Sequence, residues 1–396
     1  MDSLLLLMSN PWVPTILITC VIIGLFPLLA GYIVLLERKL LADFQVRLGP
    51  MRVGPNGLLQ PIADAVKLLA KEDIVPTGAS KAIFWLAPVV STVTALTAFS
   101  VIPFGQRVYV ADVNVGLLII SAMASVGILG IILGGWASNS HYPLLGALRS
   151  GAQLVSYEVA MALALVSGVM AAGTLSLQGI VKNQLERGVW FAFDNYGLMI
   201  VPFMVYLISA IAETNRAPFD LPEAESELVA GFMTEYSGFR WALFFLAEYA
   251  NIFVISSVAV TLFWGGWLRP FPSIGWLAVP LDYIFPVLLL AGTGIYCFVL
   301  TKRQPSRPQQ LFVAAIGAAI LLVAAVFAIP VVNQAVIGLF WFLFKVTLFL
   351  YLMIWIRGTF PRFRYDQLMN IGWKRMIPIG MAAILLNAVV GVLRAG

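Results

Sequence analysis

Charged side chains are scarce in this chain. Only 11% of its 396 residues are charged, whereas 61% are hydrophobic. An ordinary soluble domain has about a quarter of its residues charged, and a single soluble core stops growing at about 250–300 residues. Water therefore cannot hold this much apolar surface in solution. The composition excludes a soluble globular protein and fits a lipid bilayer.

Histidine and cysteine are nearly absent as well. The chain has one histidine, His141, and two cysteines, Cys20 and Cys297, which lie far apart within apolar runs. Zinc, haem and iron–sulfur centres need clusters of such side chains, so we expect no metal site and no cofactor bound directly. The net charge of +5 is not gathered into one basic patch, and it does not predict a nucleic-acid partner.

The N-terminal seven residues contain no lysine or arginine, so they lack the basic region of a cleaved signal peptide, and the first apolar run is expected to remain a helix. Ten runs of about 20 apolar residues predict spanning helices. They lack the period-two alternation of a barrel, so we predict an all-α polytopic membrane bundle, one domain over residues 1–396. The predicted spans are 12–36, 82–102, 113–136, 153–173, 190–212, 240–267, 281–300, 311–332, 334–357 and 376–394.

The basic residues divide unequally between the two alternating sets of loops. One set holds eighteen of the 24 lysines and arginines, and the other holds five. By the positive-inside rule the first set is cytoplasmic and both termini lie outside. The two longest loops, 37–81 and 213–239, belong to the cytoplasmic set, and we expect function to lie there.

Within loop 37–81, the residues beyond Gly57 have the pattern of an amphipathic helix. The apolar side holds Leu58, Leu59, Ile62, Val66 and Leu69, and the opposite side holds Asp64, Lys67 and Lys71. The pattern alone favours a helix lying on the membrane surface with a solvated polar face. The alternative, in which Asp64 and Lys67 line a polar cavity as an ion pair, stays open.

Acidic residues are concentrated between positions 213 and 248. Seven of the 19 acids fall in this window, where an even spread would place about two. They are Glu213, Asp220, Glu223, Glu225, Glu227, Glu235 and Glu248. Apolar side chains such as Phe219 and Phe232 alternate with them, and acids crowded in a partly dry place raise one another's pKa. We therefore favour a proton-exchanging function over a solvated acidic loop.

Ionisable side chains also fall inside the predicted spans. Glu158 lies early in the fourth span, Glu248 lies about 12 Å into the sixth, and Lys345 lies in the ninth. A charge facing lipid costs at least about 2.5 kcal/mol, so each should face the bundle interior. With Glu213 at the end of the fifth span, the acids are expected to converge on a hydrated path. The alternative is a set of hydrogen-bonded acids that fix helix packing.

Five ordered segments resemble one family. They are ERKLLADFQVRLGPMRVGPNGLLQPIADAVKLLAKED, GWASNSHYPLLGALRSGAQLVSYEVAM, AETNRAPFDLPEAESELVAGFMTEYSG, FFLAEYANI and FPRFRYDQLM. The family is that of the quinone-site membrane subunits of respiratory complex I, which includes the H subunit of the bacterial NADH:quinone oxidoreductase and mitochondrial subunit 1. The similarity covers most of residues 12–266 and 334–394. It implies a proton-pumping complex in the bacterial inner membrane.

The resemblance also implies partners and site residues. The family docks the hydrophilic arm, whose subunits carry the flavin and iron–sulfur cluster, and passes the redox event to antiporter-like membrane subunits; quinone is the substrate. The residues implied along the quinone chamber are Arg38, Arg47, Asp64, Arg216 and Phe219. Those implied in the proton path are Glu158, Glu213, Glu223, Glu225, Glu227, Glu235 and Glu248, and those implied at the arm interface are Arg357, Arg362 and Arg364.

The chain departs from the family's eight spans because residues 281–332 add a two-helix hairpin around the basic turn 301–310. An even addition preserves the sidedness of everything after it. Three alternatives to a complex I subunit remain: the corresponding subunit of a membrane-bound hydrogenase, a self-contained secondary ion transporter and, less favoured because of the clustered acids, a purely structural anchor.

Overall fold

The computed structural model describes residues 12–106, 108–220, 229–302, 304 and 306–395, and the regular elements in these ranges are all helices. The α-helices are α2 (Trp12–Phe44), α3 (Gln60–Ala70), α4 (Lys81–Ser100), α5 (Gly116–Ala137), α6 (His141–Ala172), α7 (Leu177–Arg187), α8 (Ile200–Glu213), α10 (Gly238–Phe263), α11 (Phe285–Thr301), α12 (Arg307–Phe327), α13 (Pro330–Thr359), α14 (Tyr365–Asn370) and α15 (Ile377–Ala395). The shorter elements are η1 (Pro55–Gly57), η2 (Phe191–Phe193), η3 (Asn195–Gly197), η4 (Gly231–Met233), η5 (Gly275–Leu277), η6 (Pro280–Ile284) and η7 (Ile371–Met376).

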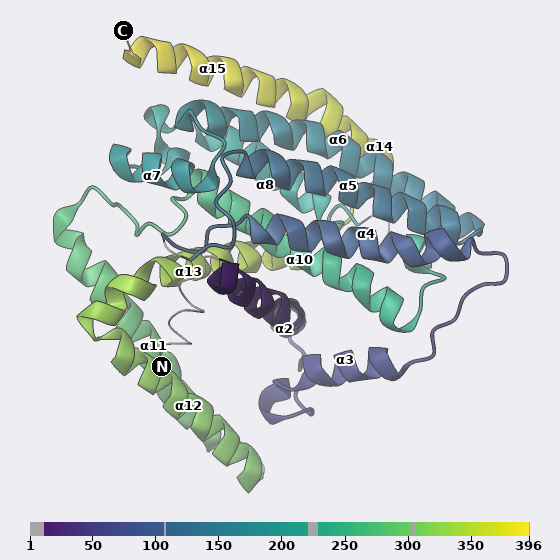
Figure 1. The fold of residues 1–396 in the computed structure, drawn as a ribbon, viewed down its shortest axis with the longest axis horizontal. Helices are drawn as coiled ribbons and strands as arrows, with labels where there is room; N and C mark the ends of the chain where they lie inside the picture. Colours follow the sequence, from purple (N-terminus) through teal and green to yellow (C-terminus); the bar gives the residue numbers. More distant parts are fainter. Residues whose placement is uncertain (1–11, 107, 221–228, 303, 305, 396) are drawn as a thin grey trace.

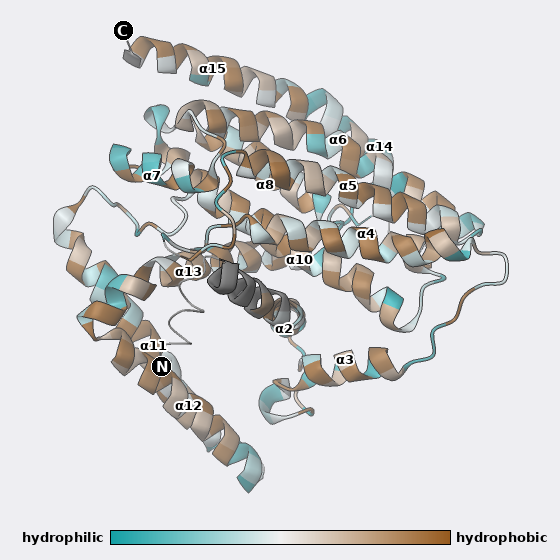
Figure 2. Cartoon of the chain, viewed as in Figure 1, coloured by the Kyte–Doolittle hydropathy of each residue, from teal (hydrophilic) through white to brown (hydrophobic). Residues whose placement is uncertain are grey.

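The fold is that of a polytopic helical membrane protein. Eight helices among the described residues are long and apolar enough to cross a membrane, and most of their ribbon is coloured as hydrophobic in Figure 2. The first predicted span lies in α2, which has 33 residues, and the fifth lies in the shorter α8. The all-α bundle expected from the apolar runs is confirmed.

Two predicted boundaries were wrong. The span predicted over 190–212 is α-helical only from Ile200, because Asn195 and Tyr196 have positive φ values of 51° and 58°, which an α-helix does not accept. The fourth span begins earlier than predicted, at His141. His141 therefore opens a helix rather than lying in a loop, and Pro143 is accommodated because it falls in the first turn.

Helix α10 is the centre of the molecule, and its neighbours include α2, α4, α8 and α13 (Figure 1). The residues buried along it include Phe253, Val260 and Phe263. Every residue from Ile252 to Phe263 is buried, so neighbouring elements enclose this half of the helix on all sides. Helices α2, α4, α8 and α13 are thereby arranged around α10.

Helices α11 and α12 form a hairpin that stands apart from this bundle in Figure 1. A Cβ added to Gly294 would lie 2.8 Å from Leu321, and one added to Gly317 would lie 3.1 Å from Cys297, so the two glycines allow the helices to approach closely. The hairpin is joined to α13 by stacked and edge-on rings of Phe285, Phe327, Phe340, Trp341 and Phe344. These contacts lie at the end of the hairpin nearest η6.

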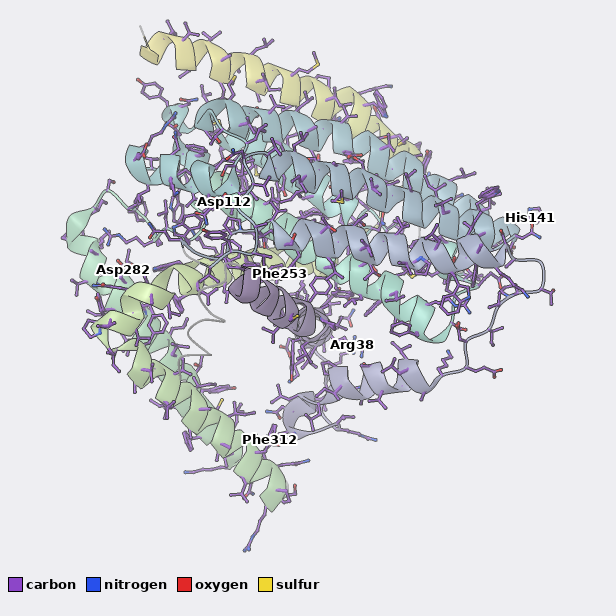
Figure 3. The ribbon with its side chains drawn as sticks, in the orientation of Figure 1. Arg38, Asp112, His141, Phe253, Asp282 and Phe312 are labelled. Carbon is purple, nitrogen blue, oxygen red and sulfur yellow. The ribbon has the colours of Figure 1, made fainter. Side chains whose placement is uncertain are left out.

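Figure 3 shows the two ends of the bundle. Asp112 and Asp282 lie toward one end and His141 toward the other, with Arg38 near the end of α2 and Phe312 near the tip of the hairpin. The positions of Asp112 and His141 match the alternation of loops predicted from the basic residues. Loops far apart in the sequence are thereby gathered at common ends.

Candidate functional site: a cavity joined to buried charges

A cavity of about 400 Å³ lies between α2, α3 and α10. Its walls are mostly apolar and include Val34 and Leu35 of α2, Leu68 of α3 and Leu246 of α10. Arg38, Asp64 and Lys67 add charge on one side. This volume and this mixture of apolar walls and a few polar groups are typical of a site for a small organic molecule.

Helix α3 borders the cavity with polar and apolar residues, the latter including Ala65 and Leu68. Asp64 and Lys67 line the cavity, whereas Ile62 and Val66 point outward and are 45% and 59% exposed. Asp64 and Lys67 form the ion pair of the open alternative, but the cavity that they border is mostly apolar rather than polar. The outward apolar face still has the character expected of a helix at a membrane surface.

Asp64 is held by three neighbours. Its carboxylate lies 2.9 Å from Nη1 of Arg38 and 3.3 Å from Nζ of Lys67. Gln60 Nε2 donates a hydrogen bond to it at 3.1 Å. Partial burial acts to raise the pKa of Asp64, but the hydrogen bond from Gln60 and the charges of Arg38 and Lys67 outweigh it, so this pKa lies below its ordinary value.

Tyr249 connects the cavity to the charges behind it. It lines the cavity, and its hydroxyl donates a hydrogen bond to Oε2 of Glu37 at 2.6 Å. Glu37 is 4% exposed and forms an ion pair with Arg357. The guanidinium of Arg216 lies 4.7 Å from the centre of the Tyr249 ring. One side chain thus contacts the cavity, a buried carboxylate and a buried cation.

The chain of charges continues from Arg216. Its Nη2 lies 3.0 Å from Oε1 of Glu248, and both side chains are nearly buried, at 13% and 11% exposure. Glu248 in turn lines a second cavity, of about 50 Å³, together with Glu213 and Asn251. This volume exceeds what one water molecule needs, and the walls offer polar partners for it.

Glu213 lies between two small cavities. One is the second cavity, described above. The other is a third cavity of about 30 Å³, which Tyr206 also lines. Glu213 and Asn251 line both. Oε2 of Glu213 is buried and has no hydrogen-bond partner among the described residues. Glu158 interacts electrostatically with Glu213 and accepts a hydrogen bond from Ser125. The structure thus brings Glu158, Glu213 and Glu248 together from three helices.

The segment after Glu213 is fixed by Gln153 on α6. Gln153 Nε2 donates hydrogen bonds to the carbonyl oxygens of Ala212, at 2.8 Å, and Phe219, at 2.9 Å. Phe219 is buried and packs against the rings of Tyr157 and Phe363. It therefore does not line the 400 Å³ cavity, and its position in the described structure is that of a packing residue.

The remaining predicted site residues lie outside the cavity walls. Arg47 is exposed and donates a hydrogen bond to Gln45, and Arg362 pairs with Asp220 at 3.0 Å. Arg364 is exposed at the start of α14, and Glu235 is half-buried beyond η4. The predicted residues Glu223, Glu225 and Glu227 lie outside the described residues.

Lys345 faces the interior, as predicted, but away from the acids. Its Nζ donates hydrogen bonds to the carbonyl oxygens of Trp264, at 2.6 Å, and Leu268, at 2.9 Å, and lies 4.9 Å from the centre of the Trp190 ring. Within the described ranges, no group of three or more histidine, cysteine, aspartate or glutamate side chains comes together to hold a metal ion.

Sequence reasoning missed two residues of the site. Tyr249 was not singled out, although it follows Glu248 directly and lies near Asn251 in the segment FFLAEYANI. The charges Glu37, Arg38 and Lys39 end the first apolar run, where they could equally mark the membrane interface, so the sequence alone does not assign Glu37 to the site. The signal available for Glu37 was its position one residue before Arg38. It lies at the end of an apolar run and next to charges that also face the bundle.

The fold and the site define a class: a polytopic helical membrane protein in which a mostly apolar cavity is connected to buried carboxylates. The family model described as NADH dehydrogenase matches residues 16–388. The chain is 69% identical over 386 residues to the NADH-quinone oxidoreductase H subunit numbered 2 of Solibacter usitatus, with 98% of each chain covered. It is 51% identical to the H subunit numbered 1 of Koribacter versatilis, covering 94% of this chain and 90% of the relative. It is 42% identical to the H subunit of Cupriavidus taiwanensis, covering 96% and 93%. The chain belongs to the family of NADH-quinone oxidoreductase H subunits.

Proposed function

We propose that this chain forms the chamber that admits quinone to a proton-pumping NADH:quinone oxidoreductase and couples quinone reduction to proton translocation. The observation that carries the proposal is the position of Tyr249. Its side chain borders the cavity, bonds to Glu37 and lies against Arg216, which pairs with Glu248. A change of charge in the cavity therefore has a short electrostatic route to the buried acids.

The chemistry of the cavity suits a quinone. A quinone has a flat apolar ring with two carbonyl acceptors and an apolar tail, and the cavity offers apolar walls beside the cations Arg38 and Lys67. Reduction to quinol consumes two electrons and two protons. In the proposed complex the electrons come from the iron–sulfur cluster and flavin of partner subunits, while this chain positions the quinone.

The acids supply the proposed coupling. Negative charge that develops on the quinone competes with Glu248 for Arg216 and with Glu37 for the hydrogen bond from Tyr249. A weakened pairing of Glu248 changes its proton affinity and that of the neighbouring acid Glu213, because interacting acids titrate as a coupled set. The 50 Å³ cavity that both acids line, and the 30 Å³ cavity that Glu213 also lines, have room for the water through which protons move.

The rest of the predicted assembly is proposed on the same footing. The cytoplasmic surface that carries Arg362 and Arg364 would receive the hydrophilic arm, and antiporter-like subunits would extend the membrane arm. Arg357 is engaged with Glu37 inside the protein, and we assign it to the coupling route rather than to the arm interface. The proposed location is the bacterial inner membrane with both termini outside.

A photoreactive quinone applied to the assembled complex tests the proposal. Labelled peptides are expected from α2, α3 and α10, the three walls of the cavity. Ala65→Trp on α3 fills the cavity and should remove the labelling and most quinone reductase activity, because Ala65 lines it. Ala70→Trp, on an exposed position of the same helix outside the lining, is the matched control and should preserve both.

The opposite results would contradict the proposal. Labelling confined to other helices, or equal labelling in the two tryptophan variants, would show that quinone does not occupy this cavity. Absence of labelling together with an intact complex would favour the hydrogenase-type alternative.

A further inference from the structure

Helix α3 forms one wall of the cavity with little of its own surface buried. None of its eleven residues is buried, and Val66 and Leu69 are 59% and 66% exposed. A helix with so few buried contacts has a low local stability and moves readily unless its ends are held. The contacts at the two ends of α3 therefore determine the width of the cavity.

The C-terminal end of α3 is tied to α10. Asp73 pairs with Arg240 at 2.6 Å, and Arg240 is 2% exposed and lies 4.1 Å from the centre of the Trp85 ring. The backbone N–H of Ile74 donates a hydrogen bond to Ser237 at 2.9 Å. This end is therefore part of the central bundle.

The N-terminal end of α3 is tied to the α11–α12 hairpin instead. Helix α12 packs on η1, the turn just before α3. Gln304, at the tip of the hairpin, is 9% exposed, and its Nε2 donates a hydrogen bond to Oδ1 of Asn56 at 3.2 Å. The backbone oxygen of Gln304 accepts a hydrogen bond from Gln310 at 3.1 Å, which ties Gln304 to the first turn of α12.

The turn η1 is stiff enough to transmit a displacement at this contact to α3. Gly57 has a φ of 74°, and a Cβ at this position would lie 2.2 Å from the carbonyl oxygen of Pro50. Pro55 and Gly57 are both buried. A displacement of Asn56 therefore moves the start of α3 rather than being absorbed in the turn.

The far end of the hairpin is also anchored. Asp282 in η6 pairs with Arg269 at 2.8 Å, and its backbone oxygen accepts a hydrogen bond from Asn333 of α13 at 2.8 Å. The cluster of aromatic rings between α11, α12 and α13 lies beside these contacts. The hairpin thus runs between a fixed point on α13 and the turn that precedes α3.

We propose that the α11–α12 hairpin is a brace for α3, and that the contact between Gln304 and Asn56 sets how often the α3 wall stands in the position that admits a ligand to the cavity. Gln304 and Asn56 are positioning residues, since neither lines the cavity. The identity of the ligand as a quinone rests on the proposed function above.

Kinetics and hydrogen exchange on the intact complex test this brace. Loss of one neutral hydrogen bond changes the ratio of two conformations about fivefold. Gln304→Ala should raise the KM for quinone about fivefold with kcat unchanged, because a smaller competent population weakens apparent binding in proportion. Amide exchange over residues 58–70 should become faster in the same variant. Gln309→Ala, on the first turn of α12, is the matched control.

A conservative substitution at the other partner separates this contact from general damage to the fold. Asn56→Asp keeps the acceptor oxygen and a residue that tolerates the positive φ of 51° at this position, so its KM and exchange rates should match those of the unaltered complex. If exchange over 58–70 is unchanged in Gln304→Ala, the brace does not exist, whatever the labelling of the cavity shows. Faster exchange with an unchanged KM would instead overturn the role of the cavity in quinone access, and with it the proposed function.

Discussion

Helices α10 and α12 are both apolar and long enough to span a membrane, yet their surroundings are opposite. In its most apolar stretch α10 is 72% buried, whereas α12 is 22% buried. Helix α10 carries Arg240, Glu248 and Tyr249, while the only charged residue of α12 is Arg307 at its start. The ionisable groups of α10 therefore lie where other helices supply partners, whereas α11 and the more exposed α12 beyond Arg307 carry none.

The comparison teaches that apolar character alone does not distinguish a functional helix from a bracing one in this protein. Burial separates these two helices, because the neighbours that enclose α10 supply the partners of its buried charges. Substitutions on α10 and its partners should therefore have much larger effects than substitutions on the hairpin.

The largest effect is expected from Arg216→Met, which leaves Glu248 without its charge partner. Breaking a buried ion pair costs about 3–5 kcal/mol. The thermal midpoint of the purified complex should fall and quinone reductase activity should be lost. Adding Glu248→Gln should restore a large part of the stability but not the activity. If the double variant is less stable than the single one, the pairing is not what stabilises this region.

A core truncation on α10 comes next. Phe263 is fully buried, with ring centres 5.5 Å from Phe203 and 5.8 Å from Tyr206. Phe263→Ala removes these contacts and leaves a cavity, at a cost of about 3–5 kcal/mol. Thermal unfolding of the purified complex measures it. A loss of stability no larger than that caused by a substitution at an exposed position of α12 would show that burial does not distinguish α10 from α12.

Asp64→Asn on the cavity wall should have a smaller effect, and it should leave the pH dependence of activity unchanged. The pKa of Asp64 lies below its ordinary value, so the pair with Arg38 is fully formed above the unfolded-state pKa of about 4 and is lost only as pH falls through the lowered folded-state pKa. The variant should raise the KM for quinone while the shape of the activity profile between about pH 5 and 8 stays the same. A shifted profile in that range would show that Asp64 titrates there.

The smallest effect is expected on the hairpin. Leu311 of α12 is 73% exposed, and Leu311→Ala should change stability by less than about 0.5 kcal/mol. Thermal unfolding and quinone kinetics should match those of the unaltered complex. A large loss would mean that this face is covered by another protein of the assembly.

The sequence predicts the features that depend on local pattern. The apolar runs predicted the helices, the pattern beyond Gly57 predicted α3, and the cost of charge in lipid predicted that Glu158 and Glu248 face inward. Their convergence with Glu213 followed because all three sit on helices of one bundle. Whether protons follow this route stays a prediction.

The features that escaped prediction depend on how distant helices cross. Tyr249 and Glu37 are 212 positions apart, and their hydrogen bond exists only because α2 and α10 cross at the level of these two residues. The ring contacts of Phe219 with Tyr157 and Phe363 join three separate segments in the same way, and a place for Phe219 along the chamber stays a prediction. A single sequence carries no signal for such pairings.

The most direct test of the central claim is the number of protons pumped per quinone reduced by the assembled complex in liposomes, measured for Glu213→Gln. Glu213 lines both of the small cavities and interacts with Glu158, so its loss should cut pumping several-fold. Glu158→Gln and Glu248→Gln should act in the same direction. Unchanged pumping in all three variants would contradict a proton path through these carboxylates.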